Sequence, residues 1–363
     1  MKSIAYDNKE LYWKRIQLIS FVLAVFIIIR HNSSLANYDA PIAQSIYDTF
    51  KYSITEVAVP LFFLISGFNY FNGFSISVQK RKFKSRIKSL LVPYLTWNTL
   101  YCIFCVVTSL FFSQFFIGRT PFTITPLNVI WGCVFHQNCN SHFWFVFDLM
   151  VCVVLNPIIY YVLRNKIAGI SFLTVLFVAI FCFGLKLPIN VFYRTDAFLY
   201  YYIGAFLGLH FNTFFYNDML WKTHINASDN QRINKANVLY FIIGVLCMCS
   251  SGLLLIPELH GSVRCIIILL TAYGFWKVSA ICRFVPFRWL PQGGTVFLFY
   301  AAHGIIQPMT VKLLYLILPK NNWMAGINFI FTITITMSLC ILLRYITKRF
   351  LPPIDKVLTG WRR

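Results

Sequence analysis

The sequence predicts an all-α integral membrane protein, a bundle of about ten transmembrane helices with both termini in the cytoplasm. Of its 363 residues, 58% are hydrophobic and only 12% are charged, against roughly 45–50% and 25% in an ordinary soluble domain. Such a chain has too few polar side chains to cover a surface in water. Its net charge of +21 is spread in short clusters between apolar runs, which indicates membrane topology and no nucleic-acid partner.

Ten apolar runs are each long enough to cross a bilayer, whose hydrocarbon core requires roughly 20 residues of helix. No soluble domain or internal repeat remains outside them, so we expect one domain over residues 1–363. The first run follows Lys14 and Arg15 and lacks a small-residue cleavage site, so we expect it to stay as an anchor. The predicted spans are 13–33, 54–72, 89–113, 142–163, 167–186, 195–216, 236–256, 262–282, 294–316 and 323–343.

The distribution of Lys and Arg predicts the orientation, because cytoplasmic connections carry the excess. With both termini inside, 24 basic residues fall on the inner side and 6 on the outer side, and two lie within spans. The run KRKFKSRIKS at 80–89 therefore lies inside. It anchors the topology or contacts anionic lipid, and its functional interpretation is a docking surface for a polyanionic cytosolic donor.

Most cysteines lie inside apolar runs, where they behave as small hydrophobic residues. Cys133 and Cys139 instead fall in a loop predicted to be outside, where either free thiols or a disulfide would persist. His136 and His142 lie close by, but the spacing matches no strong zinc-ligand pattern. We therefore expect no metal.

Ionisable side chains at membrane depth are costly and usually mark function. His31 lies 16 residues beyond Arg15, or about 24 Å along a helix in a core about 30 Å thick, which places it in the outer third. Imidazole exchanges a proton near neutral pH, so His31 is the candidate catalytic base. The neighbouring Arg30 either snorkels outward or takes part in the same site.

Other ionisable groups fall at the same predicted outer level, where they either pair with one another near the headgroups or form a site. His303, by contrast, lies about 14 Å into its span, near the middle of the membrane. The groups predicted at the outer level are Glu56, His142, Asp148, Arg194 and Asp196.

Five short motifs follow one another along the chain, beginning with His31 at the end of the first span. The others are PLFFLISGF at 60–68, RIKSLLVPYLTW at 86–97, HFWFVFDL at 142–149 and FYAAHGI at 299–305. Their order resembles the family-3 membrane acyltransferases, bacterial ten-helix proteins that mostly O-acetylate surface or secreted glycans. The resemblance covers nearly the whole chain.

The resemblance implies roles for His31, Ser66, Arg86, Tyr94, Trp144, Tyr300 and His303, and the predicted topology and charge add Arg30, Glu56, Lys82 and His142. The catalytic candidates are His31, Arg30 and Glu56. The candidates for binding the donor are Arg86, Lys82, Ser66 and Tyr94. The other candidate site residues are His142, Trp144, Tyr300 and His303.

Two positions depart from the family's pattern. Ser20 stands where many members have a basic residue eleven positions before the histidine, and Ser89 replaces the second arginine of the usual RxxR pattern that begins at Arg86. Neighbouring lysines such as Lys82 would replace the lost charge, but a lysine cannot make the bidentate contact of a guanidinium.

The activity implied by the resemblance is transfer of an acyl group, with acetyl-CoA as the expected donor, to a hydroxyl of a surface or lipid-linked glycan. The expected location is the bacterial cytoplasmic (inner) membrane, with the lipid bilayer and the glycan acceptor as partners. His31 would act as the base or carry the acyl group briefly. Because Arg86 is predicted inside and His31 near the outside, either the donor reaches into the bundle or the acyl group is handed across.

Two other function classes remain open. In a transporter or flippase of a small polar or glycan substrate, the same intramembrane Arg, His and Glu would line a path, although the inverted repeats common in transporters are not apparent. An accessory membrane subunit would leave the costly outer-level charges without a role.

Overall fold

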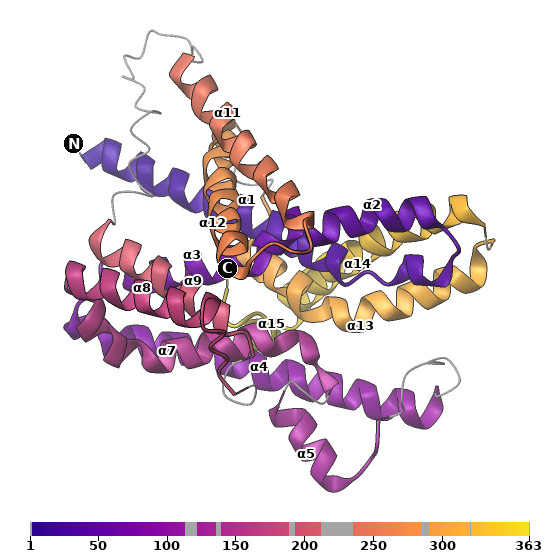
Figure 1. The fold of residues 1–363 in the computed structure, drawn as a ribbon. Helices are drawn as coiled ribbons and strands as arrows, with labels where there is room; N and C mark the ends of the chain where they lie inside the picture. The colour runs from indigo at the N-terminus through magenta and orange to yellow at the C-terminus, as the bar shows by residue number, and fades with distance from the viewer. Residues whose placement is uncertain are drawn as a thin grey trace.

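The computed structural model describes residues 2–112, 122–135, 139–188, 193–211, 235–284, 286, 290–319 and 321–362. Within these ranges the chain forms helices and no strand (Figure 1). Seven segments of this described part are long and apolar enough to cross a membrane. The predicted helical membrane bundle is therefore confirmed, whereas ten crossings and cytoplasmic termini stay predictions.

Each predicted span overlaps an observed helix, because a long apolar run needs helical hydrogen bonds once it leaves water. Residue 113 of the third predicted span and residues 212–216 of the sixth lie outside the described residues. The shortest of them, α3, is preceded by a 3₁₀ turn at Ile54–Val57, and together they cover the second predicted span. The ten helices are α1 (Lys2–Arg30), α3 (Ala58–Phe71), α4 (Ile76–Phe111), α7 (Trp144–Leu163), α8 (Lys166–Phe181), α9 (Thr195–His210), α11 (Lys235–Cys249), α12 (Gly261–Val278), α13 (Gly293–Ile317) and α14 (Asn322–Phe350).

Among the described residues, three further α-helices were not predicted: α2 (Pro41–Tyr52), α5 (Pro126–Val134) and α15 (Pro352–Thr359). Each begins with proline, whose fixed φ suits the first helical turn. All three are shorter than a membrane span. In α2, Tyr47 is buried and packs against Phe329 of α14, with ring centroids 5.6 Å apart, and the two helices run side by side (Figure 1).

Helices α3 and α9 pack most closely, through glycines. A Cβ at Gly67 would lie 2.0 Å from the carbonyl oxygen of Tyr201, and one at Gly204 would lie 2.0 Å from that of Leu64. Small residues at such crossings let membrane helices approach backbone to backbone. This contact fixes α3, and with it Ser66, on one side of the bundle.

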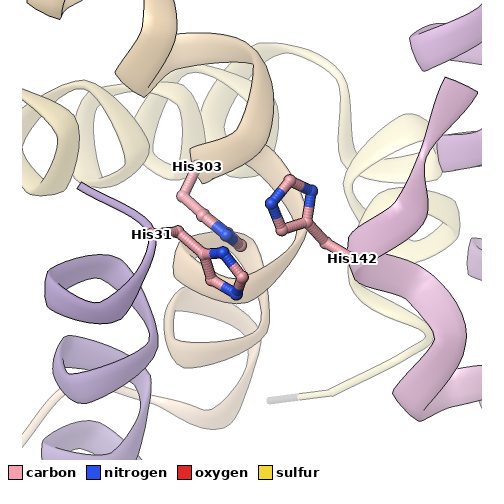
Figure 2. A group of neighbouring side chains, drawn as sticks. All are labelled: His31, His142 and His303. Carbon is pink, nitrogen blue, oxygen red and sulfur yellow. The ribbon is translucent and has the colours of Figure 1, made fainter. Parts of the chain in front are cut away.

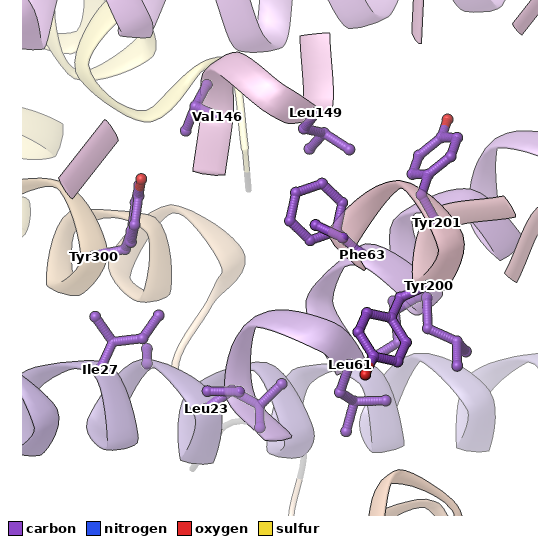
Figure 3. Close-up of a cluster of buried hydrophobic side chains, with 14 of the residues drawn as sticks. Leu23, Ile27, Leu61, Phe63, Val146, Leu149, Tyr200, Tyr201 and Tyr300 are labelled. Atoms are coloured by element: carbon purple, nitrogen blue, oxygen red, sulfur yellow. The ribbon is translucent and has the colours of Figure 1, made fainter. Parts of the chain in front are cut away.

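The core is built from aliphatic and aromatic side chains that come from most of the described helices, and Figure 3 shows part of it. Tyr300 of α13 stacks on Phe143, with ring centroids 5.2 Å apart, and meets Phe145 edge to face at 5.6 Å. Aromatic pairs of this kind hold their partners in fixed orientations. The side chains labelled in the figure are Leu23, Ile27, Leu61, Phe63, Val146, Leu149, Tyr200, Tyr201 and Tyr300.

After α14 the chain reverses at Leu351, and α15 packs back against α4. A buried ion pair between Arg344 and Asp355 joins α14 to α15. The indole Nε1 of Trp97 on α4 donates to the carbonyl of Leu358 at 2.9 Å. These contacts bring the end of the chain in among the helices, near the centre of the view in Figure 1.

Candidate active site

Three histidines from distant parts of the chain converge at one place (Figure 2). His31 follows the last residue of α1, His142 lies in a 3₁₀ turn at Ser141–Phe143, and His303 lies in α13. Their ring centroids are 4.4 Å apart for His31 and His142, 4.9 Å for His142 and His303, and 5.4 Å for His31 and His303. We call them the histidine cluster.

The position of His303 differs from the prediction, which placed it deeper in the membrane than His31. That prediction measured depth from the start of each helix and assumed helices of equal level. In the structure Gln307, one turn beyond His303, donates to the carbonyl of Ile28 in the last turn of α1 at 2.8 Å. This bond brings the two histidines to the same level.

The three histidines of the cluster differ in their exposure to solvent. His31 is exposed, His142 is partly buried and His303 is fully buried. The Nδ1 of His303 lies 2.6 Å from the carbonyl oxygen of Tyr300 and therefore carries the proton, which leaves the Nε2 lone pair free. Among the described residues this buried Nε2 has no hydrogen-bond partner. It faces the cluster as an acceptor.

Backbone contacts around the cluster fix its geometry. The hydroxyl of Tyr300 donates to the carbonyl of His142 at 2.6 Å, and that of Tyr101 donates to the carbonyl of Ala301 at 3.0 Å. A Cβ at Gly304 would lie 2.5 Å from the Tyr101 hydroxyl and 3.0 Å from Nδ1 of His142. Neither Tyr101 nor Gly304 was predicted, although Gly304 directly follows His303 in the last motif.

Arg30 and Glu56 form an ion pair of 2.9 Å at the end of α1. Arg30 also donates to the carbonyl of Lys51 at 2.7 Å, and its own carbonyl accepts from the hydroxyl of Tyr47 at 2.9 Å. These contacts join α1 to α2 and to the turn before α3. Because these contacts fix the end of α1, the geometry favours a role for Arg30 and Glu56 in positioning the adjacent His31.

A cavity of about 990 Å³, the central cavity, occupies the middle of the bundle. Its walls come from α1, α3, α4, α7, α13 and the segment after α15, and they are mainly apolar. Tyr300, which is bonded to both His142 and His303, forms part of the wall. The residues used below are Ser20, Ser66, Arg86, Phe145, Tyr300 and Arg362.

A second cavity of about 640 Å³, the basic cavity, shares Arg86 and Arg362 with the first. The two cavities therefore adjoin at these guanidinium groups. Its other residues used below are Arg81, Lys82, Lys88, Ser89 and Trp361. The run at 80–89 is thus connected, through the central cavity, with the residues that hold the histidine cluster.

A family model for the acyltransferase domain of the family-3 acyltransferases matches residues 13–345. The chain belongs to the family-3 acyltransferases. A search of the curated proteins and a search of the solved structures gave no significant match. The protein is a membrane acyltransferase, and α15 with the residues after it lies beyond the matched range.

Not every predicted donor-binding residue of this acyltransferase lines a cavity. Lys82 lines the basic cavity, but its ammonium donates to the carbonyls of Tyr70 and Asn72 at 2.6 and 2.8 Å, at the end of α3. Tyr94 is 2% exposed and packs between the rings of Phe143 and Phe147. Tyr94 therefore belongs to the core beside the site.

Trp144 also packs away from the two cavities. It stacks on Tyr193 with ring centroids 5.3 Å apart, beneath the guanidinium of Arg194 at 5.9 Å. Asp148 accepts from the backbone nitrogens of Tyr193 and Arg194 at 2.8 and 3.0 Å. These contacts hold the segment before α9 against α7.

Cys133 and Cys139 are free thiols, and His136 lies outside the described residues. The ligand atoms of His31, His142 and His303 all lie within 4.8 Å of one another. Neutral imidazoles at such distances are able to hold a metal ion as well as to pass a proton. The expectation of no metal stays a prediction.

Proposed function

We propose that this acyltransferase moves an acetyl group from a cytosolic coenzyme A thioester to a hydroxyl of a surface or lipid-linked glycan, at the bacterial inner membrane. The observation that carries the proposal is the central cavity. It extends from Arg86, beside the basic cavity, to Tyr300, whose hydroxyl and carbonyl are bonded to His142 and His303. Such a cavity supports entry of a long donor from the basic side and reaction near the histidines.

The donor's two chemical parts correspond to the two cavities. Coenzyme A carries a highly charged nucleotide and a long, mostly uncharged arm that ends in the thioester. Lys and Arg side chains line the basic cavity and favour phosphate groups, whereas the mainly apolar central cavity favours the arm. On this proposal the donor's thioester itself reaches into the bundle, which is the first of the two routes that the sequence left open.

The histidine cluster supplies the base. The acceptor oxygen attacks the thioester carbonyl carbon, the new C–O bond forms, and the C–S bond breaks. His31 takes the hydroxyl proton and returns it to the departing thiolate, so the reaction is balanced. The Nε2 of the buried His303 has no hydrogen-bond partner among the described residues, and its ring centroid lies 5.4 Å from that of His31. In the proposed mechanism it accepts the N–H of the His31 ring and so leaves the other nitrogen of His31 as the base.

The acceptor approaches from the opposite side to the donor. His31 is the exposed member of the cluster, so a hydroxyl on a large, extended glycan reaches it without entering the bundle. A lipid-linked glycan would be held beside the helices by its own lipid.

The test is to incubate membranes containing the protein with isotope-labelled acetyl-CoA and an extract of lipid-linked and surface glycans. Mass spectrometry is expected to find alkali-labile label on a sugar, and His31→Ala membranes are expected to give none. The matched control is His260→Asn, which alters an exposed histidine at the start of α12 and keeps a side chain that caps a helix.

Full activity of His31→Ala would exclude His31 as the base and move that role to His142 or His303. Absence of transfer from both acetyl-CoA and succinyl-CoA, with the protein correctly inserted, would overturn the proposal. The transporter or flippase would then be the better account of the central cavity.

A further inference from the structure

Arg362 and Arg86 meet where the two cavities adjoin, and both line each cavity. Among the described residues, neither guanidinium forms an ion pair with a carboxylate. The carboxylate that lines the central cavity, Glu10, pairs with Lys14 at 3.2 Å. Two neighbouring, partly buried guanidinium groups without a carboxylate partner favour an anion between them.

The backbone holds Arg362 firmly in this position. Its side chain donates to the carbonyl of Thr359 at 2.8 Å and lies over the ring of Phe297 at 4.1 Å. Its carbonyl accepts from Arg344 at 3.3 Å. Burial, and next the positive charge of Arg86, lowers the pKa of Arg362 to about 9, an effect that a bound anion would reverse.

The turn that leads to Arg362 is built against α4. Gly360 has φ +63°, and a Cβ there would lie 2.4 Å from the carbonyl oxygen of Ser89. Trp361 follows with φ +58°, a strained conformation for a bulky residue. The ammonium of Lys88 lies 4.3 Å from the centre of its ring. The turn therefore places Arg362 directly beside Ser89.

Ser89 is one of the two positions at which the chain lacks an expected basic residue. Ser89 lines the basic cavity and Ser20 lines the central cavity, and Arg362 lines both. We propose that the segment Gly360–Arg362 completes the donor site, with Arg362 binding the donor's phosphates together with Arg86 in place of the missing basic side chain at Ser89. This inference rests on the proposed coenzyme A donor.

A diphosphate fits this pair better than a single carboxylate does. Each guanidinium presents a planar fork of donors that matches two phosphate oxygens, and two such forks, one from α4 and one from the segment after α15, suit an anion with several oxygens. Arg81 and Lys88 line the same cavity and supply further charge for a second phosphate group. Arg362 is thus assigned to the nucleotide part of the donor, away from the reacting carbonyl.

The experiment measures binding of coenzyme A to the full-length protein in neutral detergent by calorimetry. Arg362→Gln is expected to raise the Kd roughly tenfold, as loss of a charge-assisted contact does. Arg362→Lys is expected to raise it less. Pantetheine, which lacks the phosphates, is expected to bind the wild type and Arg362→Gln equally. The matched control is Arg349→Gln, an exposed arginine of α14 outside both cavities, which is expected to leave the Kd unchanged.

A double variant distinguishes phosphate binding by Arg362 from a purely structural role of this residue. Adding Ser89→Arg to Arg362→Gln is expected to restore most of the affinity, because it returns a guanidinium to the same cavity from α4. If the wild type binds no coenzyme A, the proposed donor is wrong. If the wild type binds it and Arg362→Gln binds equally well, the inference about Arg362 is wrong. If phosphatidylglycerol micelles, and not coenzyme A, show the dependence on Arg362, the site holds a lipid headgroup and the inference fails.

Discussion

The hydroxyl of Tyr300 donates a hydrogen bond of 2.6 Å to the backbone carbonyl of His142, while its ring forms part of the wall of the central cavity. One residue thus contacts both the space assigned to the donor and the segment that carries a member of the histidine cluster. Tyr300→Phe keeps the ring and removes the bond. We expect kcat to fall about tenfold, with a loss of about 1 kcal/mol in stability, because His142 is no longer held.

Acetyl transfer and thermal unfolding measure the two effects separately. Tyr345→Phe, which removes the hydroxyl of an exposed tyrosine on α14, serves as the control and is expected to change neither. An unchanged kcat in Tyr300→Phe would show that the hydroxyl contributes to packing alone.

Gly304 allows α13 to approach both Tyr101 and His142. A methyl group at this position would lie 2.5 Å from the Tyr101 hydroxyl and 3.0 Å from Nδ1 of His142. We expect Gly304→Ala to displace the His142 ring and to lower kcat at least tenfold, while the fold persists because the added group is small.

Gly326→Ala on α14 is the matched control, since a Cβ there meets nothing within 4 Å. It is expected to retain full activity. Equal activity of both variants would show that the His142 ring adjusts without loss, and that its position is not critical for transfer.

The helices could be predicted from sequence because an apolar run of sufficient length has few alternatives in lipid. The helices that were missed, such as α2 and α15, are too short to span, and their partners are set by tertiary packing. Tyr47 is buried against Phe329 of α14, and no local sequence pattern predicts that contact. The predicted difference in depth between His303 and His31 was wrong for a related reason, since the bond from Gln307 to Ile28 sets the relative level of α13 and α1.

The three members of the histidine cluster could be predicted from the sequence, because each histidine stands in a motif of the family. Their convergence depended on the packing of three distant segments. Arg362 was not predictable, since it lies beyond the family-matched range and follows two residues with positive φ. The sequence does contain one signal: Ser89 and Ser20 stand where the family has a basic residue, which indicates that a basic side chain from elsewhere in the chain takes its place.

The ion pair between Arg344 and Asp355 anchors the segment that carries Arg362. Arg344→Met would leave the buried Asp355 carboxylate without its partner, although Thr347 still donates to it at 3.0 Å. We expect a loss of about 3–5 kcal/mol in stability, together with a weaker affinity for coenzyme A. Thermal unfolding and calorimetry measure the two.

The double variant Arg344→Met with Asp355→Leu replaces the pair by apolar side chains and is expected to regain most of the stability. Because its stability is largely restored, the affinity of this double variant for coenzyme A shows the effect of the segment's position alone. If affinity stays at the wild-type level while stability falls in Arg344→Met, the anchor and the donor site are independent.

The predicted orientation is tested by thiol labelling with a reagent that does not cross the membrane. In a background without native cysteines, we expect a cysteine at Asn322 to react in intact cells and one at Lys82 to react only after the membrane is opened. Asn322 begins α14, and Lys82 lies near the start of α4 in the basic run. The reverse pattern would place the basic cavity outside and remove the basis for a cytosolic donor.

The histidine cluster also makes a specific prediction about metals. The ligand atoms of the three histidines all lie within 4.8 Å of one another, near enough for a zinc ion with Zn–N distances of about 2.0–2.1 Å to draw them together. A metal bound to His31, however, would occupy the nitrogen that the proposed base requires. We therefore expect purified protein to contain less than one metal ion per chain, and a chelator to leave transfer unchanged. One zinc ion per chain in the wild type, lost in His142→Ala together with activity, would instead assign activation of the hydroxyl to a bound metal, and His31 would become a ligand instead of the base.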